Sequence, residues 1–306
     1  MDETTFEAGR AVVATPAGPL SYVAVGTGQA AVFVHGVGTN AYLWRNLIGH
    51  LAGERRCIAL DLPLHGRSPA SADQDFTLGG LADTVIAFVD ALGLARFDLV
   101  AHDTGGAVAQ IVAARVPHRL RSFTLTNCET HDNVPPDGFK PTVELARSGA
   151  LVASAPMLLA DLVAARGAVF AMGYEDPEHL AIETVRAFLE PVLGTPTAAR
   201  QFARLLTSLS PRDLLAVEDE LATLTVPTLV VWGTGDEMFD VSWAHWLHNL
   251  IPGVTRVVEL ADARLFFPDE RADQLAALLR QHWSETDTIE QTRDTGTSTT
   301  RGGRAR

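Results

Sequence analysis

The chain has 306 residues, of which 47% are hydrophobic and 20% are charged, a composition typical of a globular protein large enough for one domain with an insertion. The 24 basic and 37 acidic residues give a formal net charge of -13, so a nucleic-acid partner is not expected. Cys57 and Cys128 lie in strand-like runs, which favours two small buried apolar residues over a disulfide or a metal pair.

The N-terminal residues lack the basic and apolar regions of a signal peptide. The most apolar segment, residues 150–172, is interrupted by Pro156, Asp161 and Arg166, which argues against a membrane span. We therefore expect a cytoplasmic protein with no membrane partner. The sequence indicates no cofactor and no metal, and it does not indicate the oligomeric state.

Strand and helix patterns alternate along residues 1–128. The predicted strands are an antiparallel pair at 9–14 and 21–25, followed by buried runs at 30–34, 57–60, 97–101 and 122–126. The predicted helices are 40–51, 78–92 and 107–115. This alternation predicts an α/β fold with a mostly parallel, doubly wound sheet and helices on both of its faces.

The alternation stops between residues 129 and 222, where only helical runs separated by prolines occur, at 143–159, 178–192 and 198–209. We interpret this segment as an inserted helical cap. The core pattern then resumes over 223–283, with strands at 228–232 and 256–260 and helices at 241–250 and 269–283. Residues 284–306 are rich in Thr, Gly and Arg with almost no apolar residues, which predicts a disordered tail.

The most informative motif joins the strand at 97–101 to the helix at 107–115. Ala101, Asp103 and Gly105 follow the small-x-nucleophile-x-small pattern of a nucleophile elbow. Such a turn is so tight that the residue at its tip adopts a strained backbone conformation and holds its reactive atom clear of the sheet. The residue at this tip is an aspartate, and a carboxylate attacks a different kind of carbon from the alkoxide of a serine.

Four motifs occur in the order found in the α/β-hydrolase superfamily: His35-Gly36, residues 61–68, residues 102–106 and residues 232–236. Residues 10–283 resemble this superfamily, which implies the α/β-hydrolase fold with an inserted helical cap. The aspartate at the elbow resembles the haloalkane dehalogenase and epoxide hydrolase branch. In that branch a carboxylate attacks an sp3 carbon, and water activated by a histidine hydrolyses the resulting ester. A carboxylate needs no deprotonation at neutral pH.

The resemblance implies roles for several residues. Asp103 is the expected nucleophile and Asp236 the expected acid. The expected oxyanion hole consists of the backbone N–H groups of Val37 and Thr104. The expected supporting loop consists of His35, Gly36 and Gly38.

The sequence departs from this pattern at the histidine, because alignment of the segment after the last strand puts Leu265 at that position. General-base help is worth roughly 10²–10⁴-fold, so an alkyl ester on Asp103 should accumulate. Thr104 also stands where relatives often carry a tryptophan after the nucleophile. Tyr174 is the single tyrosine of the cap, whereas epoxide hydrolases usually present two.

Two nearby residues are candidate replacements for the acid or the base. Glu129 follows the strand at 122–126, where some haloalkane dehalogenases place their acid, and a solvated loop residue is an equal alternative. His131 lies two residues further on, and a surface histidine is the preferred interpretation. Two converging carboxylates would raise the pKa of one of them and could form an acid/base pair.

These observations leave three functional hypotheses. The first is a hydrolase acting on a small apolar molecule, because an apolar cap over a polar site implies such a substrate. The second is a non-hydrolytic isomerase, cyclase or lyase that uses Asp103 as acid and base. The third is a catalytically silent protein that binds a ligand. The apolar residues expected to form the cap interior are Phe139, Met157, Phe170, Met172 and Phe188.

Overall fold

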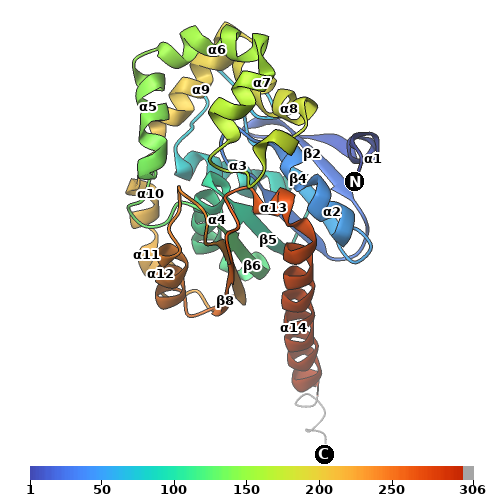
Figure 1. The fold of residues 1–306 in the computed structure, drawn as a ribbon. Helices are drawn as coiled ribbons and strands as arrows, with labels where there is room; N and C mark the ends of the chain where they lie inside the picture. The colour runs from blue at the N-terminus through green and yellow to red at the C-terminus, as the bar shows by residue number, and fades with distance from the viewer. Residues whose placement is uncertain (299–306) are drawn as a thin grey trace, which may run out of the picture.

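The computed structural model describes residues 1–298 and contains one eight-stranded sheet with the order β1-β2-β4-β3-β5-β6-β7-β8 (Figure 1). The strands are β1 (Arg10–Thr15), β2 (Gly18–Val25), β3 (Ala30–Val34), β4 (Arg56–Leu60), β5 (Phe97–His102), β6 (Leu120–Thr126), β7 (Thr228–Gly233) and β8 (Val254–Leu260). The pairs β1–β2 and β2–β4 are antiparallel, and every other pair is parallel. The predicted mostly parallel sheet is confirmed.

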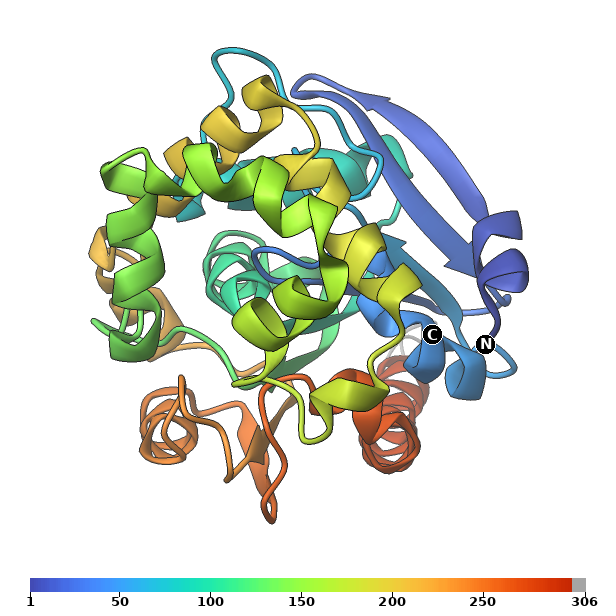
Figure 2. The ribbon, with the colours of Figure 1, turned by 45° about the horizontal axis from the view of Figure 1, so that its top comes forward.

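Four central strands, β3, β5, β6 and β7, are buried along their whole length, which explains why their sequences are rich in apolar residues. The core helices cover both faces of the sheet. Helix α3 packs on α4, and α2 packs on α14; Figure 2 shows α4 (green) and α14 (red) on opposite sides of the sheet. The core helices are α1 (Glu3–Ala8), η1 (Ala41–Trp44), α2 (Arg45–Leu51), α3 (Leu78–Ala91), α4 (Thr104–Arg115), η2 (Pro117–Arg119), α12 (Ser242–Leu250), α13 (Phe267–Glu270) and α14 (Ala272–Ser298).

Between β6 and β7 the chain forms helices that lie over one end of the sheet (Figures 1 and 2). They are η3 (Asp137–Phe139), α5 (Lys140–Arg147), α6 (Ala150–Ala160), α7 (Leu162–Ala165), η4 (Arg166–Phe170), η5 (Pro177–His179), α8 (Ile182–Leu193), α9 (Pro196–Ser208), α10 (Arg212–Leu215) and α11 (Glu218–Leu221). We call this helical segment the cap; its boundaries at residues 129 and 222 stay predictions.

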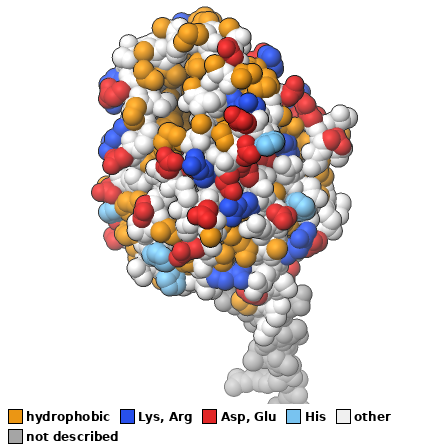
Figure 3. All heavy atoms as spheres, viewed as in Figure 1, with side chains coloured by type: hydrophobic (Ala, Val, Ile, Leu, Met, Phe, Trp, Pro, Cys, Tyr) orange, Lys and Arg blue, Asp and Glu red, His pale blue; other side chains and the backbone are white. Residues whose placement is uncertain are grey.

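The prediction of a single helix at residues 143–159 is wrong, because the helix is interrupted between α5 and α6. Gly149 has a φ of 79°, in the left-handed region that ends a helix and that glycine adopts readily. Met157 and Met172 were expected inside the cap, but their side chains are 70% and 41% exposed, whereas Phe170 and Phe188 are buried. Figure 3 shows apolar side chains gathered on the outer surface of the cap, at the top of the view.

The predicted start of the tail at residue 284 is wrong, because α14 continues to Ser298. Local composition misses the long-range contacts that hold this part of the helix. Trp283 is buried, and the Asp287 carboxylate pairs with Arg55 and Arg121. The remaining part of the predicted tail, residues 299–306, lies outside the described residues.

Arg121 joins the helix to the sheet, so its loss should destabilise the fold. Its guanidinium is 7% exposed and pairs with Asp287 and Glu290 of α14. Arg121→Ala should lower the free energy of unfolding by on the order of 3 kcal/mol, because partly buried carboxylates lose their cation. Urea unfolding measures this change, and Arg147→Ala, which removes an exposed cap residue paired within its own helix, is the control. Equal stability of the two variants would contradict the prediction.

Both cysteines are free and buried, as predicted. Within residues 1–298 no single helix is long and apolar enough to cross a membrane; by length and composition alone, one pair bent by 101°, Asp137–Arg147 with Ala150–Ala160, passes the test jointly.

Candidate active site

The turn between β5 and α4 has the geometry of a nucleophile elbow. Asp103 stands at its tip with φ 54° and ψ -138°, a left-handed conformation that costs a non-glycine residue about 1–3 kcal/mol. The turn brings α4 so close to the end of β3 that a Cβ on Gly105 would lie 2.3 Å from the His35 carbonyl oxygen. The backbone N–H of Asp103 donates to the Asn127 carbonyl oxygen at 2.9 Å, which fixes the tip against the end of β6.

The carboxyl group of Asp103 is directed back towards the loop after β3. It accepts hydrogen bonds from the backbone N–H groups of Val37 and Thr104. A Cβ on Gly36 would lie 1.9 Å from its Oδ2 atom, so only a glycine leaves space for the carboxyl at this position. The Asp103 residue is 7% exposed. The carboxyl is therefore held in a nearly dry site by two backbone donors.

Two further carboxyl groups lie at the same end of the sheet because β5, β6 and β7 are parallel neighbours. Glu129 follows β6, and its Oε1 accepts a hydrogen bond from the Thr104 hydroxyl at 2.7 Å. Its Oε2 atom is buried and has no hydrogen-bond partner. Asp236 follows β7, and its Oδ2 accepts a hydrogen bond from the Asn127 amide at 2.6 Å. Solvation of Glu129, one of the two alternatives, is excluded because the residue is 1% exposed.

Burial shifts the acidity of all three groups in the same direction. It raises the pKa of Asp103 well above the usual range for a carboxyl, and the charges of Glu129 and Asp236 raise it further. Burial also raises the pKa of Glu129, against the hydrogen bond from Thr104, and raises the pKa of Asp236 to about 6. All three groups therefore hold their protons to higher pH than ordinary carboxyl groups do. Within residues 1–298, no group of His, Cys, Asp and Glu side chains is arranged to hold a metal ion.

Leu265 lies in the loop after β8 and is buried beside the site. The loop is tied to the Asp236 loop by a hydrogen bond from the Gly235 N–H to the Ala263 carbonyl oxygen at 2.9 Å. It is tied to the cap by a second bond, from the Phe266 N–H to the Gly173 carbonyl oxygen at 2.8 Å. That Leu265 stands at the position of the histidine stays a prediction, and its side chain offers no proton acceptor.

None of the ten histidines, all within residues 1–298, forms a hydrogen bond with Asp103. His131, a candidate base, instead pairs with Glu218 and packs against the ring of Trp246 at 4.9 Å. His102 is buried, and its Nδ1 bonds to the Thr126 hydroxyl at 3.0 Å. Burial lowers the pKa of His102 to about 3, which keeps the ring neutral.

His35 stabilises the loop that carries Val37. Its Nε2 accepts a hydrogen bond from the Leu62 N–H at 3.0 Å, which leaves Nδ1 to donate to the Gly36 carbonyl oxygen at 2.7 Å. His65 similarly accepts a hydrogen bond from the Gly38 N–H at 3.2 Å. Both rings are thus occupied in holding the loop.

Sequence reasoning missed Asn127, which joins three parts of the site. Its carbonyl accepts the Asp103 N–H, its side-chain oxygen accepts the Gly233 N–H at 2.7 Å, and its amide donates to Asp236. The signal was its place directly after β6, between the two strands that carry the aspartates. Sequence reasoning also missed the Thr104 hydroxyl as the partner of Glu129.

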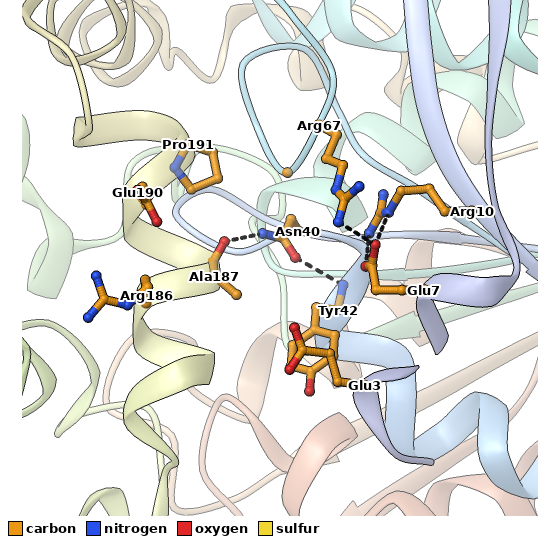
Figure 4. Close-up of a pocket in the computed structure, with 11 residues that line it drawn as sticks. Glu3, Glu7, Arg10, Asn40, Tyr42, Arg67, Arg186, Ala187, Glu190 and Pro191 are labelled. Atoms are coloured by element: carbon orange, nitrogen blue, oxygen red, sulfur yellow. Dashed lines mark hydrogen bonds and ion pairs between the residues drawn. The ribbon is translucent and has the colours of Figure 1, made fainter. Parts of the chain in front are cut away.

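A separate surface pocket of about 400 Å³ lies where the cap meets the core (Figure 4). The Asn40 amide bridges this junction by donating to the Ala187 carbonyl oxygen of α8 at 2.7 Å. Arg10 and Glu7, on the core side, form an ion pair at 2.6 Å. None of the predicted site residues lines this pocket, so it is distinct from the carboxyl cluster.

Comparison with known proteins indicates the α/β-hydrolase superfamily. A family model described as alpha/beta hydrolase fold matches residues 31–149. The chain is 27% identical over 278 residues to haloalkane dehalogenase 2 of Mycobacterium tuberculosis, covering 86% of this chain and 90% of that protein. It is 24% identical over 297 residues to a cis-3-alkyl-4-alkyloxetan-2-one decarboxylase of Shewanella oneidensis, covering 88% and 86%. The crystal structure of the haloalkane dehalogenase DbeA from Bradyrhizobium elkani is similar in fold, with a TM-score of 0.78, 21% identity and coverage of 92% and 99%.

Proposed function

Because the chain belongs to the α/β-hydrolase superfamily, we propose that it is an enzyme in which the Asp103 carboxylate attacks an sp3 carbon of a small apolar molecule. The substrate class is an alkyl halide or an epoxide, and the product of the first step is an alkyl ester on Asp103. The haloalkane dehalogenase relatives support this reaction class.

One observation carries the proposal: the Asp103 carboxyl accepts hydrogen bonds from the backbone N–H groups of Val37 and Thr104 at the tip of the elbow. These donors orient the carboxylate for attack. When water later adds to the ester, the same N–H groups can stabilise the negative charge that develops on the oxygen. A serine elbow uses such donors for the substrate carbonyl, whereas here the carbonyl belongs to the enzyme.

The first step should become faster as the pH rises. Burial raises the pKa of Asp103, which shifts the group towards the neutral acid, and a neutral acid is a poor nucleophile. Incubation with bromohexane or epoxyhexane, followed by intact-mass spectrometry, should reveal an adduct on Asp103 whose rate of formation increases with pH. A rate that falls with rising pH, or an adduct elsewhere, would contradict the nucleophilic role.

A second candidate is a proton-transfer enzyme, an isomerase, cyclase or lyase. The specific observation in its favour is the same raised pKa, because a buried acid that holds its proton more firmly than an ordinary aspartate can donate it and take it back. The relative whose printed name is that of a decarboxylase supports this candidate. Conversion of a carbonyl substrate without any Asp103 adduct, in a protein that leaves both electrophiles unchanged, would favour it over the hydrolase.

A further inference from the structure

Glu129 is fastened to the residue that also holds the nucleophile. The backbone N–H of Thr104 donates to the Asp103 carboxyl, and the hydroxyl of the same residue donates to Oε1 of Glu129 at 2.7 Å. The Gln110 amide donates to the Glu129 carbonyl oxygen at 2.8 Å, which fixes the backbone. Thr104 therefore links the two carboxyl groups through two hydrogen bonds, and neither group needs to move when a ligand arrives.

The second oxygen of Glu129 is unused. Oε2 is buried and has no hydrogen-bond partner, which is costly for a polar atom unless another group or a water meets it. Both oxygens of Asp236, by contrast, accept hydrogen bonds, from Asn127 and from the Met238 N–H. No histidine within residues 1–298 forms a hydrogen bond with Asp103 to serve as a base beside this oxygen.

We propose that Oε2 of Glu129 accepts the proton of the water that hydrolyses the alkyl ester on Asp103, the role that a histidine at position 265 would have. This inference rests on the proposed function, because it requires the ester. The sequence leaves hydrolysis of the ester without a base, because Leu265 stands where the histidine is expected. The inference assigns this role to a carboxylate.

The step balances in atoms and charge. The water oxygen bonds to Cγ of Asp103 while one water proton passes to Oε2 of Glu129, and the carbonyl electron pair moves to the oxygen held by Val37 and Thr104. The intermediate then breaks the bond between Cγ and the alkyl oxygen. The alkoxide leaves with the proton from Glu129, which restores the glutamate and the Asp103 carboxyl and releases an alcohol.

The acidity of Glu129 suits this role. Burial raises its pKa to about 7, so the group exchanges a proton at neutral pH, where an ordinary glutamate is a weak base. Only the ionised form of Glu129 accepts the water proton, so ester hydrolysis should rise with pH through about 7 and then level off. Conversion of Asp103 to a neutral ester removes one neighbouring negative charge, while the burial that raises the Glu129 pKa remains.

The test follows the ester by intact mass after a single exposure to bromohexane. In the wild type the adduct should form and then decay. In Glu129→Gln the adduct should form at least as fast, because one negative charge beside Asp103 is gone. It should then decay roughly 10²-fold more slowly, and the decay rate should not rise with pH near neutrality. Glutamine keeps the size of the side chain and the bond from Thr104. Glu237→Gln, at a residue whose side chain is 53% exposed, is the matched control and should behave as the wild type.

A second variant separates a chemical role from a structural one. Thr104→Val keeps the backbone N–H on Asp103 but removes the hydroxyl that stabilises the charged form of Glu129. The midpoint of the pH profile for ester decay should move to higher pH, with the same plateau rate. A purely structural contribution of Glu129 would change the melting temperature without moving this midpoint.

Each outcome is decisive. An ester that decays equally fast in the wild type and in Glu129→Gln, or one that never decays in either, overturns the inference and leaves the nucleophilic role of Asp103 standing. The absence of an ester in the wild type and in Glu129→Gln overturns the proposed function, and the inference with it.

Discussion

Asp103→Asn should abolish adduct formation, with a loss of roughly 10⁴-fold or more in the rate of consumption of the electrophile. An amide oxygen is a far weaker nucleophile than a carboxylate, and no other side chain in the described site is held by both Val37 and Thr104. Residual consumption can be followed by release of bromide from bromohexane, which does not require the adduct to survive.

The fold should tolerate this change. Asparagine accepts the left-handed backbone conformation of the tip more easily than most residues, and it removes a buried acid that is costly to ionise. The melting temperature should therefore be equal to that of the wild type or higher. Asp262→Asn is a matched control, because Asp262 also has a positive φ, of 60°, and lies in an exposed loop. Full activity in Asp103→Asn would show that the assignment of the site is incorrect.

Leu265→His, introduced into Glu129→Gln, should accelerate hydrolysis of the ester by roughly 10²–10⁴-fold, because it places an imidazole where the alignment expects the general base. The loop that carries residue 265 is bonded to the loop that carries Asp236, so the new ring has a carboxylate nearby to orient it. The measurement is the decay rate of the Asp103 ester in a single-turnover experiment with bromohexane.

The control for this variant is Leu265→Asn, likewise introduced into Glu129→Gln, which adds a buried polar group of similar cost without a base. Both variants should lower the melting temperature, since Leu265 is 6% exposed and packs within the core. Only the histidine variant should speed the decay. Equal decay rates in the two variants would mean that position 265 is not directed at the reacting carbon.

The architecture of this chain follows from local patterns. The buried strands were visible as short runs rich in apolar residues, and the elbow was visible as Ala101, Asp103 and Gly105 between a strand and a helix. Each signal lies within a short stretch of sequence. A parallel strand is buried on both faces and therefore favours apolar residues, and a tight turn requires small residues at its flanks. The four motifs of the α/β-hydrolase superfamily could likewise be recognised without knowing which residues meet in the fold.

The parts that the sequence did not predict depend on distant partners. Glu129 is buried and hydrogen-bonded by Thr104 and Gln110, which come from a different element. Similarly, α14 extends past residue 284 because Asp287 meets arginines from β6 and from the segment before β4. Periodicity describes one segment at a time, so it cannot indicate which polar side chains will be paired across the fold.

The hydrogen bond from the Phe266 N–H to the Gly173 carbonyl oxygen joins the cap to the loop of Leu265. If the cap swings away to admit a ligand, this bond either breaks or pulls the loop outward. A histidine engineered at position 265 would therefore stand on a loop whose place depends on this contact with the cap, so its contribution to catalysis would be sensitive to any movement of the cap.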